Sequence, residues 1–99
     1  MATYPPLDSS SVVHRAPEVV ASAIHGEVVM VDLEAGLYFG LDQIGTEIWE
    51  RLEHRTSVRD LVAYLAGRYD APEDVIERDV LALLGQLQER ALIVAELPD

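Results

Sequence analysis

The chain has 99 residues, which is enough for one domain with a single core of modest stability. Hydrophobic residues make up 49% of it, which excludes a disordered chain, and the absence of cysteine excludes disulfides and thiolate metal sites. The formal net charge is -11, and all 7 basic residues are arginines, so we expect the surface to repel nucleic acid. The acidic charge either attracts basic partners or serves only solubility.

Residues 1–11 contain two prolines and three consecutive serines, so we expect a flexible N-terminal arm followed by a single domain over residues 12–99. The first residues lack the basic and apolar regions of a signal peptide. No apolar run approaches the roughly 18 residues that span a membrane. A cytoplasmic protein with no membrane partner is therefore expected.

Alternating apolar residues predict a three-stranded antiparallel meander, with strands over Val19–Ile24, Val28–Leu33 and Leu37–Leu41. His25-Gly26 fits a two-residue hairpin turn, and Gly36 fits the left-handed position of the next turn. The outer strands of such a meander each have one neighbour. Two further short segments, Val12–Arg15 and Leu92–Ala95, read as extended chain.

Three helices are predicted after the meander. Asp42 is a good N-cap for a first helix over about Gln43–Glu53, and Ser57 begins a capping box for the second. Pro72 and two acidic residues favour the start of the third, which extends to about Arg90. The predicted fold class is α+β, a winged-helix-turn-helix-like arrangement with a three-stranded antiparallel β-meander followed by three α-helices.

The last strand, Leu37–Leu41, has neither charge nor proline to protect its open edge. Gly40 allows another backbone to approach, and the apolar stripe of the third helix is wider than one core contact requires. We therefore expect a peptide to add to this edge as a strand. The candidate binding residues are Leu37, Tyr38, Phe39, Gly40, Leu41, Val75, Asp79, Leu83 and Gln86.

The same pattern has plainer interpretations. Leu37, Phe39 and Leu41 share one face and fit a core role, which makes Tyr38 the better contact candidate. The N-terminal arm or a homodimer partner is an alternative occupant of the edge.

No constellation of residues indicates catalysis. The three histidines are scattered and lack ligand partners at helical spacing, and no glycine-rich phosphate loop occurs. The acidic run on the third helix is typical of a solvated face. We therefore predict no catalytic residue, no metal site and no cofactor.

Four segments in this order and spacing resemble the PqqD-like proteins, which are RiPP recognition elements: 36–52 (GLYFGLDQIGTEIWERL), 57–61 (SVRDL), 68–72 (RYDAP) and 79–84 (DVLALL). The sequence pattern YFGLD…G…IW is most similar to that of the free-standing members of lasso-peptide pathways. The resemblance implies a protein that is not an enzyme. It implies that a precursor leader peptide docks as an added antiparallel strand on Leu37–Leu41, against the helix that starts at Pro72.

For a lasso pathway, the resemblance also implies a separate cysteine leader peptidase as a partner, followed by a ring-closing cyclase. Alternatives are a peptide chaperone for a PQQ or other radical-enzyme pathway, or an acidic winged-helix dimerisation module. A winged-helix transcription factor is disfavoured, because residues 72–90 carry five Asp or Glu against two Arg.

Overall fold

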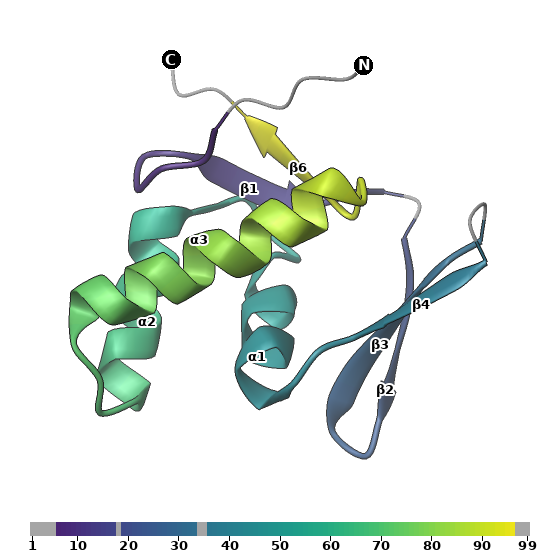
Figure 1. The fold of residues 1–99 in the computed structure, drawn as a ribbon, viewed down its shortest axis with the longest axis horizontal. Helices are drawn as coiled ribbons and strands as arrows, with labels where there is room; N and C mark the ends of the chain where they lie inside the picture. Colours follow the sequence, from purple (N-terminus) through teal and green to yellow (C-terminus); the bar gives the residue numbers. More distant parts are fainter. Residues whose placement is uncertain (1–5, 18, 34–35, 97–99) are drawn as a thin grey trace.

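The computed structural model describes residues 6–17, 19–33 and 36–96, which form two small antiparallel sheets and three helices (Figure 1). In chain order the elements are β1 (Val12–Arg15), β2 (Val20–Ile24), β3 (Glu27–Asp32), β4 (Leu37–Gly40), α1 (Gln43–Arg51), β5 (Thr56–Ser57), α2 (Val58–Arg68), α3 (Glu73–Glu89) and β6 (Ile93–Glu96). Within these residues, no helix is both long enough and apolar enough to span a bilayer. The predicted α+β class is confirmed.

The predicted meander is present, with the strand order β2-β3-β4. Val31 pairs with Val20 on one side and with Tyr38 on the other, so β3 is the central strand. His25 and Gly26 both have positive φ, at 54° and 83°, which is the geometry that a two-residue turn requires. Gly36 has φ 67° and fills the left-handed position of the second turn. Among the described residues, no strand pairs with the outer side of β2 or of β4, as predicted.

The second sheet, of order β5-β1-β6, joins the two ends of the domain. Val13 pairs with Ala95 of β6 and with Thr56 of β5. The sequence predicted β1 and β6 as extended segments but not their pairing. A ladder between segments some 80 residues apart leaves no local signal in either one, because its register depends on how the helices fold between them.

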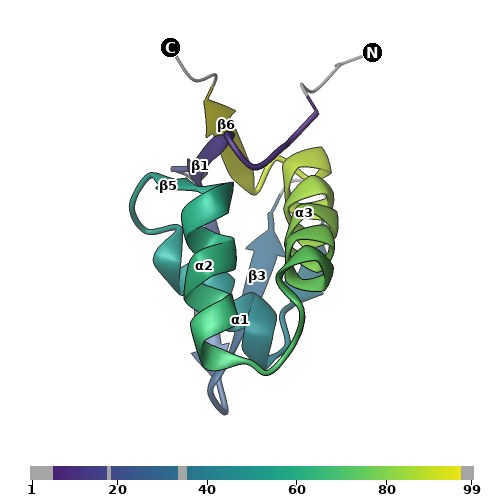
Figure 2. The same cartoon turned by 90° about the vertical axis from the view of Figure 1, so that its left-hand side faces the viewer.

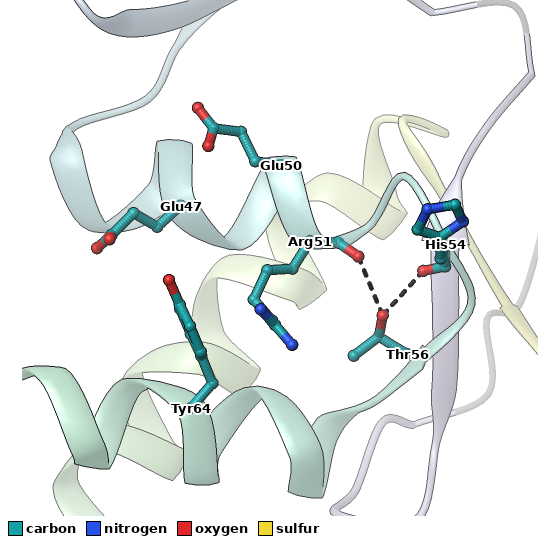
Figure 3. Close-up of a pocket in the computed structure, with 6 residues that line it drawn as sticks. All are labelled: Glu47, Glu50, Arg51, His54, Thr56 and Tyr64. Atoms are coloured by element: carbon teal, nitrogen blue, oxygen red, sulfur yellow. Dashed lines mark hydrogen bonds between the residues drawn. The ribbon is translucent and has the colours of Figure 1, made fainter.

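The helix starts agree with the predicted caps. The Asp42 carboxylate accepts a hydrogen bond from the Gly45 amide at 2.8 Å, and the Ser57 hydroxyl accepts one from Asp60 at 3.1 Å. The first helix ends at Arg51, two residues earlier than predicted. The Thr56 hydroxyl binds the carbonyl of Arg51 at 3.0 Å and that of His54 at 2.8 Å, and so satisfies backbone that the helix leaves open (Figure 3).

One apolar core joins the helices to both sheets. Val13 of β1, Met30 of β3, Leu52 and Leu84 are all fully buried within it. Figure 2 shows α2 and α3 side by side with β3 behind them, and Figure 1 shows the hairpin of β2 and β3 projecting away from the helices. All five residues of β2 are exposed as a result.

The second half of the predicted arm contacts the domain. The carbonyls of Ser9 and Ser11 accept hydrogen bonds from the amides of Arg59 and Val58, at 3.0 and 2.9 Å, and Leu7 packs against the core. These contacts lie at the start of α2. Residues 1–5 fall outside the described part of the chain, so the flexible arm over residues 1–11 stays a prediction.

Candidate functional site

On the outer side of β4, no strand in the described part of the chain pairs with the backbone groups. The amide of Leu41 donates to the Val28 carbonyl at 2.9 Å, so Leu41 points toward β3. Hydrogen-bonding direction alternates along an antiparallel strand. The amides and carbonyls of Tyr38 and Gly40 therefore point away from β3, toward the open side. A Cβ added at Gly40 would meet no atom within 4 Å, so the packing of the chain does not itself require glycine there.

The side chains of the predicted strand divide between two faces. Leu41 is 5% exposed and belongs to the core, while Phe39 is half-buried against it. Leu37, on the same face near the hairpin tip, is 50% exposed. Tyr38 lies on the opposite face and is 76% exposed. The expected core role thus holds for Leu41 and in part for Phe39, and Tyr38 is the open contact that the alternation predicted.

The predicted residues of α3 form one row along the helix. Val75, Asp79, Leu83 and Gln86 follow each other at spacings of four, four and three, which places them on one side. Val75 and Leu83 are half-buried, and Asp79 and Gln86 are exposed. This row is distinct from the fully buried positions that face the core, such as Val80 and Leu84.

A cavity of about 380 Å³ lies beside the row, at the C-terminal end of β4. Three of the predicted residues, Val75, Asp79 and Leu83, line it together with Asp42 and Ile44 from the start of α1. Further apolar lining comes from Ile48, Leu65, Ile76 and Val80. The structure thus brings most of the predicted α3 residues to one hollow, with the two carboxylates among its lining.

Arg90 extends the same row by four residues and was not among the binding residues predicted from the sequence. Its guanidinium carbon lies 5.1 Å from the centre of the Phe39 ring, so the end of α3 meets β4 directly. The signal that could have found it was the continued helical spacing after Gln86. Ile44, which also lines the cavity, was not among the predicted binding residues and is 43% exposed.

Thr46 fixes the end of β4 against α1. Its hydroxyl accepts a hydrogen bond from the Val28 amide at 3.0 Å and contacts the Leu41 carbonyl at 3.5 Å. Thr46 is 4% exposed, so this hydroxyl replaces the ladder bond that β3 and β4 would otherwise make. We call the open edge of β4, the cavity and the α3 row from Val75 to Arg90 the β4–α3 site.

A second hollow, of about 360 Å³, lies between α1 and α2 and is polar (Figure 3). Glu47, Arg51, His54 and Tyr64 are among its lining residues, and the Arg51 guanidinium lies 4.0 Å from the centre of the Tyr64 ring. Figure 3 shows Arg51 and Tyr64 pointing toward each other from the two helices. These contacts hold α1 against α2.

Glu47 links this hollow to the β4–α3 site. Its carboxylate lies 2.6 Å from an Arg68 nitrogen and accepts a hydrogen bond from the Tyr69 hydroxyl, and Tyr69 lines the cavity. The hydrogen bond to Glu47 raises the pKa of Tyr69, with a smaller contribution from burial. The negative charge of Glu47 also raises the pKa of Arg68. The cavity wall is therefore held by an ionic contact between α1 and the end of α2.

The sequence model of the family described as Coenzyme PQQ synthesis protein D (PqqD) matches residues 27–93, about two thirds of the chain. The chain belongs to the PqqD family. The matched segment runs from β3 to the start of β6 and contains both walls of the β4–α3 site. A search of the curated proteins found no match.

Solved structures agree with this family membership. The chain is similar to TbiB1 in complex with the TbiA(beta) leader peptide, with 31% identity, a TM-score of 0.76 and coverage of 87% of this chain and 99% of that one. It is also similar to lasso peptide synthetase B1 complexed with the leader peptide, with 26% identity, a TM-score of 0.72 and coverage of 83% and 96%.

A third similar structure is the PqqD truncation of Methylobacterium extorquens PqqCD, described as a functional, stand-alone RiPP recognition element. It has 22% identity and a TM-score of 0.74, and the match covers 89% of this chain and 94% of that one. This PqqD-family chain therefore has the fold of a RiPP recognition element.

Proposed function

We propose that this protein binds the leader segment of a ribosomally made precursor peptide by β-strand addition to β4, and presents it to a partner leader peptidase in lasso-peptide maturation. The observation that carries the proposal is the open edge of β4 beside an apolar cavity. An extended peptide on such an edge gains main-chain hydrogen bonds along the strand, and pockets beside it supply specificity.

The backbone of β4 offers two residues to an added strand. The outward amides and carbonyls of Tyr38 and Gly40 can pair with peptide residues without disturbing β3, because β3 bonds to the other side of β4. Gly40 has open space where a side chain would stand, which favours close backbone approach. An incoming strand would also cover an edge that otherwise invites aggregation.

Side chains of the added strand would alternate between two environments. Those on the face shared with Phe39 and Leu41 point toward α3, and one of them would enter the cavity beside Val75 and Leu83. Those on the other face would lie along Tyr38. A large apolar side chain suits the cavity, because most of its lining is aliphatic.

The pathway is inferred from the relatives. The two similar leader-peptide complexes are a TbiB1 and a lasso peptide synthetase B1, at 31% and 26% identity, and this supports a lasso role over the alternative PQQ or radical-enzyme role. In the proposed role the protein is a non-catalytic carrier in the cytoplasm. The cleavage belongs to a separate cysteine peptidase and the ring closure to a cyclase. A homodimer through β4 is the competing use of the same edge.

Fluorescence anisotropy with a labelled peptide tests the proposal. The probe is the leader of the precursor encoded beside this gene, titrated against the full chain. Saturable binding with a Kd between about 1 µM and 1 nM is expected, which corresponds to about -8 to -12 kcal/mol. Absence of saturable binding would contradict the proposal. A concentration-dependent dimer that the leader fails to dissociate in sedimentation would favour the dimerisation module instead.

A further inference from the structure

Arg90 differs from three of the other six arginines in making no ion pair within the described residues. Arg55, Arg68 and Arg78 each lie within 4.0 Å of a carboxylate, whereas Arg90 has no such partner among the described residues. Its guanidinium lies over the ring of Phe39, on the outer strand β4. A guanidinium stacked on a ring keeps its N–H donors in its own plane, where they are available to a carboxylate.

The contacts at its two ends fix the direction of α3 relative to β4. The C-terminal end of α3 meets Phe39 through Arg90, and its N-terminal half meets Asp42 and Ile44 at the cavity. The helix and the strand therefore run in opposite directions, with parallel slopes in Figure 1. A peptide added antiparallel to β4 passes the cavity first and Arg90 later.

The distance between the cavity and Arg90 can be estimated along β4 and along α3. Along β4, Phe39 and Asp42 are three residues apart, or about 10 Å of extended chain. Along α3, Asp79 and Arg90 are 11 residues apart, or about 16 Å of helix. Extended peptide covers these distances in about three to five residues. Side chains alternate between faces, so an even spacing of four places both on the α3 side.

We propose that the β4–α3 site selects a peptide that carries a carboxylate side chain four residues after the apolar side chain in the cavity, with Arg90 as the partner of that carboxylate. This inference rests on the proposed peptide-binding function and adds to it the direction in which the peptide binds. At the other end of the row, Asp79 and Asp42 disfavour an acidic side chain near the cavity. A peptide bound in the opposite direction would place its carboxylate beside these two aspartates. The two ends of the α3 row therefore favour one direction of the peptide.

A phage-displayed library of randomised twelve-residue peptides, selected against the full chain, tests the inference without the natural precursor. We expect enriched sequences to share a large apolar residue followed four positions later by Asp or Glu. Selection against Arg90→Gln should lose the acidic preference, and selection against Arg90→Glu should replace it with Lys or Arg. Arg59→Gln removes the same charge from an exposed position on α2 and should leave the preference unchanged.

Affinity measurements on one enriched peptide give the second readout. Replacing its carboxylate with the amide should weaken binding to the native chain by about two- to fivefold, as for an exposed ion pair, and should not weaken binding to Arg90→Gln. Equal loss on both proteins, or no acidic preference in the library, overturns the inference. In either case the proposed function stands if the peptides still bind and Gly40→Pro weakens that binding by about tenfold or more. If no peptide is enriched, both fail.

Discussion

The two outer strands of the projecting sheet have equally open edges but different surroundings. β2 is exposed along its whole length, whereas β4 meets α3 through Phe39 and is followed along the chain by Asp42 and Ile44, which line the cavity. An open edge supplies hydrogen bonds of the same kind in every protein. The helix beside β4 supplies side-chain contacts that can distinguish one peptide from another. The comparison favours β4, which has α3 as a second wall, over β2 as the edge that would bind the proposed peptide.

Trp49→Ala is expected to have the largest effect of the substitutions. It lowers the stability of the domain as a whole and does not distinguish β2 from β4. Trp49 is 3% exposed in the core, so its truncation should lower the free energy of unfolding by about 3–5 kcal/mol through cavity formation. Urea denaturation at low temperature measures this. The Kd of the folded fraction for the leader should stay unchanged. A parallel loss of affinity would mean that the site depends on the core as a whole.

Gly40→Pro and Ala21→Pro compare the two edges directly. Both place proline where the amide points away from β3, so neither removes a ladder bond, but only Gly40 lies in the β4–α3 site. Gly40→Pro should weaken leader binding by about tenfold or more, since a donor is lost and a ring is added. Ala21→Pro should not change the affinity measured by anisotropy.

The thermal unfolding of the same pair provides the control. Both variants should have similar midpoints, because their prolines replace equivalent positions on opposite edges. If Gly40→Pro melts far below Ala21→Pro while its folded fraction binds normally, Gly40 has a structural role only.

Leu83→Ala tests the contribution of the α3 side chains that lie beside β4. Leu83 is half-buried at the cavity, and loss of its exposed methyl groups should weaken leader binding by about fivefold, equivalent to roughly 1 kcal/mol of apolar contact. Leu81 is half-buried on another side of α3, so Leu81→Ala is the matched control. Equal effects of the two substitutions on Kd would place the contact elsewhere.

The smallest expected effect concerns the pH dependence of the cavity wall. The pKa of Tyr69 is raised by its hydrogen bond to Glu47, so its contribution to stability is present below the ordinary tyrosine pKa of about 10 and is lost as pH rises through the raised value. Thermal melts from about pH 9 to 12 should fall less steeply for Tyr69→Phe than for the native chain. Tyr38→Phe, at a 76% exposed position, should retain the native slope.

Several features of the fold and site were accessible to sequence reasoning because their signals are local. The turn glycines, the caps of Asp42 and Ser57, and the alternation of the strand at Leu37–Leu41 each depend on neighbouring residues. The row of Val75, Asp79 and Leu83 follows from helical spacing in the same way. These local rules predicted the meander and the helices.

Other features required the folded chain. Thr46 completes the ladder between Val28 and Leu41, and no pattern in its own helix predicts that contact. Arg90 reads as an ordinary exposed residue until α3 is placed against Phe39. The pairing of β1 with β6 depends on both ends of the domain, so a search of local patterns misses it.

The sequence by itself determined which elements form, that the last strand of the meander is unprotected, and which family the chain resembles, because periodicity, caps and turn residues act over a few positions. The tertiary structure alone decided that α3 runs opposite to β4, with the cavity at one end and Arg90 at the other. That arrangement arises from packing between segments distant in the chain. The proposed direction of peptide binding along Leu37–Leu41 rests on that arrangement.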